Sequence, residues 1–309
     1  MIILKTIEEL ARLKGPIVLA AGTFDGVHLG HQALIRRAME EAATCGGTAV
    51  VLTFDRHPAS LLRPENAPKL LTRNQEKIAL LEGMGVSALL MLEFTSELAT
   101  VPAIDFITSL TDSCSPLHAI CVGSQWSFGR RGEGNVDLLK KLSSARGFVV
   151  IQIDPFKVGM DPISSTRIRT AITSGDLAQA VACLGRPFLL SGTVVSGAGL
   201  GATIGFPTAN LDMEGMQLPP DGVYAVRVYH GSLVLCGVCN IGLRPTVDPS
   251  SKRRVVEVHL FDLAQNLVGE ELSLEFVQYL RAEQKYSDIV ALKEQISRDC
   301  QTARELLRL

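Results

Sequence analysis

The chain has 309 residues, of which 47% are hydrophobic, and a formal net charge of −2 at pH 7. This length allows two domains of ordinary size, each with its own core. The near-neutral charge argues against a nucleic-acid partner, for which a basic domain is expected. No apolar run approaches the roughly 20 residues of a membrane-spanning helix, and the first residues lack the pattern of a signal peptide. We therefore expect a cytoplasmic globular protein without a nucleic-acid or membrane partner.

The first 155 residues or so alternate short apolar runs with amphipathic segments. The predicted strands span residues 16–21, 48–54, 86–92, 118–123 and 148–153. Between the first two, residues 31–44 carry apolar side chains at helical spacing. Continuous apolar strands separated by helices predict a parallel sheet that is covered on both faces. The expected architecture is a doubly wound α/β domain.

The pattern changes near residue 185, where a glycine-rich stretch begins. Alternating segments follow at residues 223–230, 233–242, 253–262 and 270–280. They predict the short strands of an antiparallel barrel or sandwich. The last 23 residues have helical spacing, with Ser287 as the expected N-cap. The apolar face of that helix comprises Ile289, Leu292, Ile296, Cys300, Ala303 and Leu307. We predict one domain over residues 1–184 and a second over residues 185–309.

The seven cysteines are scattered along the chain and are expected to be reduced and mostly buried. One pair, Cys236 and Cys239, has the spacing of metal ligands. No second pair and no nearby histidine completes a site, so we interpret the pair as ordinary strand residues.

The segment GTFDGVHLGH (residues 22–31) follows the first predicted strand and opens the first helix. A helix N-terminus at the carboxyl end of a parallel strand favours phosphate binding. His28 and His31 lie on one helix face and can donate hydrogen bonds to the same anion. They are suited to stabilise an α-phosphoryl group while pyrophosphate leaves. The alternatives are a zinc site, for which His57 is the only nearby candidate for a third ligand and not a convincing one, and two ordinary surface histidines.

A second segment, ISSTRIR (residues 163–169), stands just before another helical pattern. Hydroxyl and guanidinium groups at a helix start suit the oxygens of a triphosphate. An ordinary helix cap with solvated arginines is the alternative. Together with the histidine segment, the pattern favours a nucleotide site.

In the second half, GFPTAN (residues 205–210) follows a glycine-rich loop. Thr208 and Asn210 offer hard oxygen ligands for Mg²⁺, whereas the plain alternative is a glycine-rich hairpin. Further on, Glu257 shares a strand face with Val255, His259 and Phe261. An isolated carboxylate among apolar neighbours is a candidate general base, and the alternative is a solvated residue on an exposed strand face.

These segments carry a family resemblance. GTFDGVHLGH and ISSTRIR resemble the two nucleotide-binding motifs of the His-x-Gly-His nucleotidyltransferases. GFPTAN, GVCNIGLRPTV, VEVHLFD and LRAEQKYSDIVALKEQISRD resemble the successive signatures of the riboflavin kinase module. In this order they resemble, over essentially the whole chain, the prokaryotic bifunctional riboflavin kinase/FMN adenylyltransferases, or FAD synthetases. The resemblance implies a nucleotidyltransferase-type α/β domain followed by an antiparallel β-barrel with a terminal helix.

The resemblance also implies an activity and its residues. The second domain would phosphorylate riboflavin to FMN with Mg²⁺ and ATP, with Glu257 as base and Thr208 and Asn210 binding the metal–nucleotide complex. The first would convert FMN and ATP to FAD and pyrophosphate, with His28 and His31 as catalytic groups. The expected ATP- and phosphate-binding residues are Gly22, Thr23, Phe24, Asp25, Ser164, Ser165, Thr166, Arg169, Gly199, Gly201 and Gly205. The expected flavin-binding residues are Asp55, His57, Pro58, Gln125, Trp126 and Phe128. We expect a monomer or a weak homo-oligomer.

One segment departs from the family pattern. Residues 123–129 read GSQWSFG, where the family usually has G-x-D/N-F-R-F-G. Ser127 stands where the family has an arginine, which the resemblance places near the flavin phosphate. Loss of this cation is expected to weaken the free energy of flavin binding by about one or two kcal/mol. Arg130 or Arg131 is the candidate replacement, and Asn135 stands where aspartate is common. The alternative function is a riboflavin kinase whose first domain has lost adenylylation or acts as a nucleotide or flavin sensor.

Overall fold

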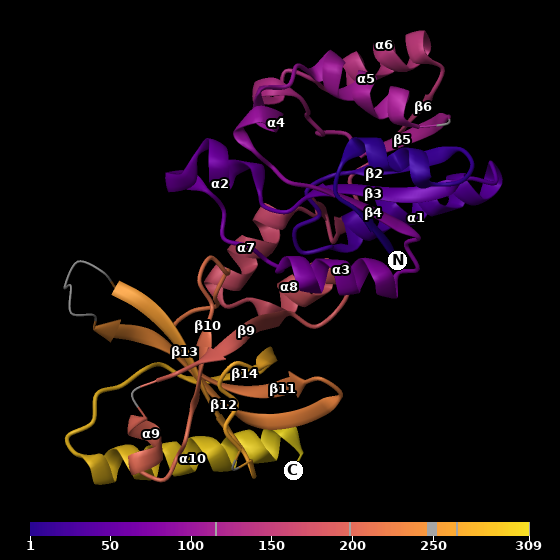
Figure 1. The fold of residues 1–309 in the computed structure, drawn as a ribbon. Helices are drawn as coiled ribbons and strands as arrows, with labels where there is room; N and C mark the ends of the chain where they lie inside the picture. Colours follow the sequence, from indigo (N-terminus) through magenta and orange to yellow (C-terminus); the bar gives the residue numbers. More distant parts are fainter. Residues whose placement is uncertain (115, 198, 246–251, 264, 309) are drawn as a thin grey trace. The chain divides into compact units, whose positions relative to one another are not determined.

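The computed structural model describes all residues except 115, 198, 246–251, 264 and 309. It divides into two compact units (Figure 1). Unit 1 comprises Met1–Arg167 and Cys183–Gly185, and unit 2 comprises Ile168–Ala182 and Arg186–Leu309. The division falls within the two helices α7 (Ser165–Ser174) and α8 (Leu177–Leu184). The domain boundary after residue 184 stays a prediction.

Unit 1 is built on a sheet of six parallel strands in the order β1-β4-β3-β2-β5-β6. The strands are β1 (Ile2–Leu4), β2 (Ile17–Ala21), β3 (Thr48–Phe54), β4 (Ala88–Leu92), β5 (Leu117–Gly123) and β6 (Val149–Ile153). The chain runs outward from β2 through β3 to β4, then returns to the other side of β2 for β5 and β6. This reversal confirms the predicted doubly wound sheet. The short edge strand β1 was not predicted, because three residues are too few to set a period.

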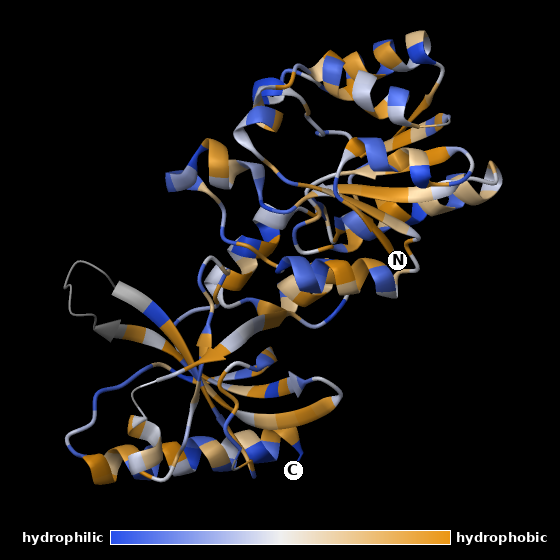
Figure 2. Ribbon diagram, in the orientation of Figure 1, coloured by the Kyte–Doolittle hydropathy of each residue, from blue (hydrophilic) through white to orange (hydrophobic). Residues whose placement is uncertain are grey.

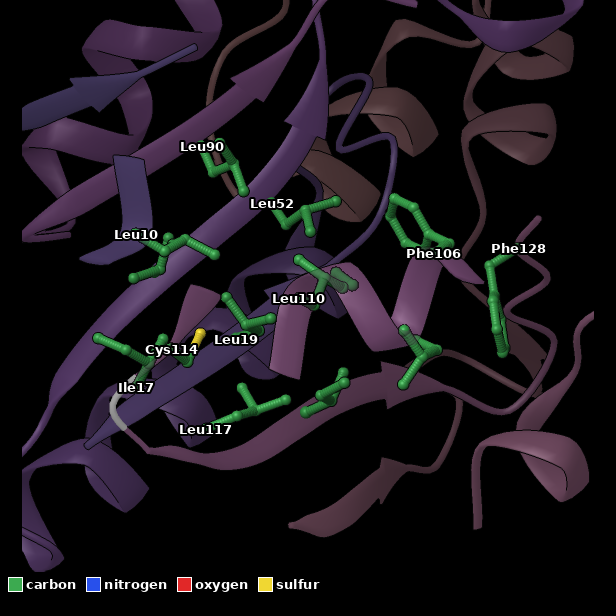
Figure 3. Close-up of a cluster of buried hydrophobic side chains, with 14 of the residues drawn as sticks. Leu10, Ile17, Leu19, Leu52, Leu90, Phe106, Leu110, Cys114, Leu117 and Phe128 are labelled. Carbon is green, nitrogen blue, oxygen red and sulfur yellow. The ribbon is translucent and has the colours of Figure 1, made fainter. Parts of the chain in front are cut away.

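Helices cover both faces of this sheet. The helices α1 (Leu29–Thr44) and α3 (Asn74–Gly83) contribute buried side chains to one core cluster. The 3₁₀ helix η1 (Ile7–Arg12), α5 (Ala103–Ser113) and α6 (Val136–Arg146) contribute to the other, part of which Figure 3 shows. Because successive strand residues point to opposite faces, Leu19 and Leu52 join one cluster while Val18 and Val51 join the other. Double burial explains the continuous apolar strands, which Figure 2 shows as mostly hydrophobic.

Shorter elements connect these layers in unit 1. They are α2 (Pro58–Leu62), η2 (Pro64–Asn66), α4 (Ser96–Thr100), η3 (Arg130–Gly132), β7 (Lys157–Val158) and β8 (Asp161–Pro162).

Unit 2 contains a closed antiparallel barrel in the order β10-β13-β12-β11-β14-β9. The strands are β9 (Leu189–Val195), β10 (Ala209–Asp212), β11 (Gly222–His230), β12 (Leu233–Pro245), β13 (Lys252–Leu260) and β14 (Glu271–Arg281). Closure decides between the barrel and the sandwich. The sequence pattern missed β9, where Ser191 and Gly192 interrupt the apolar residues, and the four-residue β10. The short helix α9 (Leu200–Thr203) lies in the loop between them.

The C-terminal helix α10 (Ile289–Leu307) confirms the predicted helical end, with two differences. Its N-cap is Asp288 rather than Ser287, because the Asp288 carboxylate accepts hydrogen bonds from the backbone N–H groups of Val290 and Ala291. Ile289, expected on the apolar face, is 58% exposed. Ala303 and Leu307 pack against barrel residues as predicted.

The pair Cys236 and Cys239 lies within β12, with Arg227 and Tyr224 as the respective cross-strand neighbours. Side chains three residues apart in a strand point to opposite faces. The two thiols therefore cannot share one metal ion. Among the described residues, no helix is both long and apolar enough to span a bilayer.

A buried ion pair joins α10 to the barrel. The guanidinium of Arg281 donates hydrogen bonds to both carboxylate oxygens of Asp299 at 2.8–3.0 Å, and Gln295 donates another at 2.9 Å. Asp299 is only 6% exposed. Such a pair matters most when one partner is removed, because the other charge is then buried without compensation.

We expect Asp299→Ala to lower the free energy of unfolding by about 3–5 kcal/mol, measured by urea denaturation followed by circular dichroism. Glu294, on the same helix, forms an exposed pair with Arg298 at 3.3 Å. Glu294→Ala should change the free energy of unfolding by less than about 0.5 kcal/mol. Equal effects of the two substitutions would contradict the assigned role of the buried pair.

Candidate functional site

The histidine segment lies at the point where the sheet of unit 1 reverses direction. Strand β2 runs into residues 22–28, and helix α1 begins at Leu29 (Figure 1). The neighbouring strand β5 leads into residues 124–129. Ligands of doubly wound sheets bind at the carboxyl ends of the two strands that flank such a reversal. The topology thus brings the histidine segment and the departing GSQWSFG segment to one edge.

The backbone between β2 and α1 is held in an unusual conformation. Phe24 has φ +50° and Val27 has φ +38°, a region that non-glycine residues rarely adopt. At Gly26, with φ +85°, an added Cβ would lie 2.8 Å from the Leu71 side chain. Strain of this kind persists only where surrounding contacts enforce it.

The carboxylate of Asp25 supplies these contacts. It is 3% exposed and accepts hydrogen bonds from the backbone N–H groups of Leu71 and Thr72 at 3.0–3.2 Å. The Thr72 hydroxyl oxygen in turn accepts the N–H of Gly26 at 3.0 Å. Asp25, which the sequence placed among the phosphate-binding residues, therefore ties the loop to the segment before α3.

His28 and His31 lie face to face, with ring centroids 3.6 Å apart and planes inclined by 15°. His28 is the N-cap of α1, and its Nδ1 accepts the backbone N–H of His31 at 3.2 Å. The proton of neutral His28 therefore lies on Nε2. Gly30 allows this packing, because a Cβ there would lie 3.2 Å from the His28 ring.

The second ring, that of His31, is kept neutral. Burial lowers its pKa well below the usual value, and the nearby charges of His28 and Lys77 lower it further. Its Nδ1 is buried without a hydrogen-bond partner in the described part of the chain. A buried polar atom of this kind is destabilising unless a ligand satisfies it. The pair thus places two stacked imidazoles, of which that of His31 is neutral, beside the N-terminus of α1, where an anion is favoured.

The hydroxyl-rich segment meets this loop directly. Ser165, the first residue of α7, donates its hydroxyl hydrogen to the backbone oxygen of Asp25 at 2.9 Å. Ser164 accepts the N–H of Arg167 at 3.1 Å, as a helix cap does. The Arg167 guanidinium donates to backbone oxygens of the β7–β8 hairpin, including Asp161 at 2.8 Å. The segment therefore combines the two interpretations, a helix cap and a neighbour of the histidine loop.

The remaining phosphate-binding candidates of α7 lie close to the division between the units. Thr166 is exposed and belongs to unit 1, whereas the half-buried Arg169 belongs to unit 2. Phosphate binding by Thr166 and Arg169 stays a prediction.

Three predicted flavin-binding residues follow β3. Asp55 accepts the backbone N–H of Phe94 at 2.9 Å, so its carboxylate holds the neighbouring strand's end. His57 caps α2 through Nδ1, which accepts the N–H of Ala59 at 3.1 Å, and Pro58 is the first residue of that helix. A pocket is lined by Asp55 and His57 together with Thr23 and Asp25 of the histidine loop, among others. The structure therefore joins part of the predicted flavin set to part of the predicted ATP set.

The other three flavin candidates follow β5. The rings of Trp126 and Phe128 are stacked with centroids 4.6 Å apart. Phe128 is 6% exposed and belongs to the core, so Trp126 stacks on a buried ring. Gln125 is exposed. Asn135 is the N-cap of α6, and its side-chain oxygen accepts the N–H of Leu138 at 2.9 Å. An aspartate would cap the helix in the same way, which explains why asparagine is tolerated.

In unit 2, the barrel register brings the kinase candidates together. Glu257 of β13 lies between Asn210 of β10 and Asn240 of β12 as cross-strand partners. Val255 and His259 share the half-buried face of Glu257, whereas the residues between them are buried. The predicted strand face and the alternation of β13 are thus present, with Phe261 lying beyond the strand.

The glycine-rich loop packs closely against Thr208 and Asn210. A Cβ at Gly197 would lie 2.1 Å from the side-chain nitrogen of Asn210, and a Cβ at Gly201 would lie 3.3 Å from the hydroxyl of Thr208. Gly199 and Gly205 have φ +70° and +91°, which favours glycine. The loop therefore approaches both predicted metal ligands through backbone alone.

Two further residues complete this site, and the sequence pattern did not single them out for it. His259 Nδ1 donates to the backbone oxygen of Pro207 at 2.8 Å and so holds the GFPTAN turn against β13. Glu283 accepts the side-chain N–H of Asn240 at 2.9 Å, and its carboxylate lies over Gly242. The sequence signal that could have identified His259 and Glu283 was their presence in the family motifs VEVHLFD and LRAEQKYSD.

Known proteins resemble the chain along its whole length. A family model described as FAD synthetase matches residues 11–167, and one described as riboflavin kinase matches residues 184–307. The bifunctional riboflavin kinase/FMN adenylyltransferase of Escherichia coli K12 is 40% identical over 293 residues, covering 94% of this chain and 93% of that protein. Its namesake in Bacillus subtilis 168 is 36% identical over 290 residues, covering 93% and 91%.

A solved structure agrees with the fold. A crystal structure described as that of a macrolide-efflux protein from Streptococcus pneumoniae superimposes with a TM-score of 0.83 at 29% identity. The similarity covers 98% of this chain and 99% of that one. Given both family models in succession and full-length relatives at 36–40% identity, the chain belongs to the bifunctional riboflavin kinase/FMN adenylyltransferase family.

Proposed function

We propose that the chain makes FAD from riboflavin in two steps, each in its own unit. Unit 2 transfers the γ-phosphoryl group of ATP to riboflavin, which gives FMN. Unit 1 transfers the adenylyl group of a second ATP to FMN, which gives FAD and pyrophosphate. The observation that carries the proposal is the stacked pair of imidazoles at the N-terminus of α1, because it equips unit 1 for transfer rather than for binding alone. This supports the bifunctional enzyme over a kinase with an inactive or sensing first domain.

In unit 1, His28 and His31 act on the α-phosphoryl group of ATP. A phosphate oxygen of FMN attacks the α-phosphorus, the bond to the β-phosphate oxygen breaks, and pyrophosphate leaves. Neutral imidazoles donate hydrogen bonds to the charge that develops on the oxygens, which is the kind of stabilisation that grows in the transition state. The loop from Gly22 to Asp25 and the hydroxyls of Ser164 and Ser165 surround the phosphates.

In unit 2, Glu257 removes the proton from the terminal hydroxyl of the ribityl chain. The hydroxyl oxygen attacks the γ-phosphorus, and ADP leaves. Proton removal by a positioned carboxylate contributes roughly 10²–10⁴-fold in rate. Asn210 and Asn240 are the cross-strand neighbours of Glu257 in the barrel register.

The residues around the glycine-rich loop fit a magnesium ion. Thr208 and Asn210 supply neutral oxygens, and the absence of a Cβ at Gly197 lets the backbone of the loop approach the Asn210 amide closely. Bound there with ATP, Mg²⁺ would neutralise phosphate charge. We also propose that the enzyme is cytoplasmic and acts as a monomer or weak homo-oligomer.

The first test is a chromatographic time course of the purified protein with riboflavin, ATP and Mg²⁺. We expect FMN to form first and FAD to follow, both abolished by excess EDTA. Accumulation of FMN without FAD would refute the adenylyl transfer in unit 1. Absence of both products would refute the whole proposal.

His28→Asn tests the imidazole pair. Asparagine is also a good N-cap, so it retains an acceptor for the His31 N–H while the Nε2 donor is lost. We expect FAD synthesis from FMN and ATP to fall by about a hundredfold or more, with the thermal midpoint and the kinase rate unchanged. His118→Ala is the matched control, because His118 lies on β5 and contacts Glu41 at 3.0 Å instead. Unchanged FAD synthesis in His28→Asn would contradict the assignment.

Glu257→Gln tests the base. The amide keeps the shape of the side chain but accepts no proton, so FMN formation should fall by roughly 10²–10⁴-fold. FAD synthesis from supplied FMN is the control within the same chain and should be unaffected. A kinase rate close to that of the parent protein would exclude Glu257 as the base.

A further inference from the structure

Lys77 is a buried cation that no motif of the sequence singles out. It is the fourth residue of α3 and is 6% exposed. Lysine is rarely buried to this extent unless an anion compensates its charge. Burial lowers the pKa of Lys77, and the carboxylates of Asp25 and Asp55 counteract part of that shift.

The hydrogen bonds of the Lys77 ammonium use two of its three N–H donors in the described part of the chain. Its ammonium donates hydrogen bonds to the backbone oxygens of Thr23 at 3.1 Å and Phe54 at 3.4 Å. An ammonium has three N–H donors, and within the described ranges these two oxygens are its hydrogen-bond acceptors. The nearby carboxylates are bound to backbone N–H groups, Asp25 to Leu71 and Asp55 to Phe94. The third N–H donor of the ammonium is thus available to a ligand.

The position of Lys77 indicates which ligand that is. It lines the pocket that contains Thr23 and Asp25 of the ATP loop as well as Asp55 and His57 of the flavin set. Adenylyl transfer joins the α-phosphorus of ATP to a phosphate oxygen of the acceptor. The acceptor's phosphate must therefore lie where the two sets of residues meet.

We propose that Lys77 binds the phosphate of the acceptor, a flavin phosphomonoester, in unit 1. The inference rests on the proposed adenylyl transfer and specifies how that site distinguishes FMN from riboflavin. The ammonium holds the phosphate by charge and by its third N–H, and it neither gives nor takes a proton. The new bond forms between an acceptor phosphate oxygen and the α-phosphorus while the bond to pyrophosphate breaks.

The test compares Lys77→Gln and Lys77→Met in the full-length protein. Gln retains an N–H donor for the backbone oxygens but has no charge, whereas Met has neither. Lys14→Met is the matched control, because Lys14 is exposed and precedes β2 at the opposite edge of the sheet. The KM values for FMN and for ATP are measured separately, together with the kinase rate and the thermal midpoint.

We expect both Lys77 variants to raise the KM for FMN by roughly tenfold or more. The KM for ATP, the kinase rate and all parameters of Lys14→Met should stay at the parent values. If Lys77 had only a structural role, Lys77→Met would lose the hydrogen bond to the backbone oxygen of Thr23. The KM for ATP would then rise and the thermal midpoint would fall in that variant, whereas Lys77→Gln would behave as the parent protein. That result, or unchanged KM values in both variants, would overturn the inference about Lys77 but not the proposed function. Failure of the parent protein to make FAD would overturn the proposed function and this inference with it.

Discussion

The hydrogen bonds accepted by the buried carboxylate of Asp25 determine the geometry of the N-terminal site. They fasten the segment after β2 to Leu71 and Thr72, which lie just before α3. Only with this attachment can Phe24 and Val27 keep positive φ values, and the same attachment directs the chain into α1 with His28 as its N-cap. Ser165 adds a contact to the backbone oxygen of Asp25. The stacked imidazoles therefore follow a loop that the Asp25 carboxylate fastens to the segment before α3.

The two units solve one physical problem in different ways. Both must bring protein groups close to a highly charged phosphate chain and release the product afterwards. In the proposed mechanism, unit 1 does so with a helix N-terminus, two stacked imidazoles and a strained turn. Unit 2 uses a glycine-rich loop that approaches Thr208 and Asn210 where side chains would collide. In neither case does the proposed chemistry require a covalent bond to the protein, so positioning and electrostatics carry the catalysis.

The sequence predicted those features that depend on local patterns. Apolar strands of a doubly buried sheet, the helical spacing of α10 and the pairing of motifs with strand ends all leave a periodic or positional signal. Features that depend on which distant residue a side chain contacts leave no such signal in the sequence. Nothing in the sequence indicates that Asp25 fastens the loop, because its hydrogen-bond partners lie 46 and 47 residues away. The sequence analysis did not single out Lys77, because its burial depends on the packing of α3 onto the sheet.

The predictions of helix boundaries and short strands were wrong or missing for similar reasons. Asp288 competes with Ser287 as N-cap, and both residue types favour that position, so only the backbone geometry decides. Strand β10 has four residues and is fixed by its pairing with β9 and β13, which no local window contains. The departures from the family pattern are the informative case. Trp126 replaces a phenylalanine within residues 123–129 and stacks on Phe128, as another aromatic ring would. Asn135, beyond that segment, caps α6 as an aspartate would.

The central claim is that the two reactions reside in separate sites of one chain, linked by FMN. The most direct measurement mixes two variants, His28→Asn and Glu257→Gln, with riboflavin, ATP and Mg²⁺. Each variant alone should make little FAD, the first because FMN accumulates and the second because no FMN forms. The mixture should make FAD, because FMN released by one protein is adenylylated by the other. A mixture that makes no FAD, although each variant retains its own half-reaction, would contradict the account.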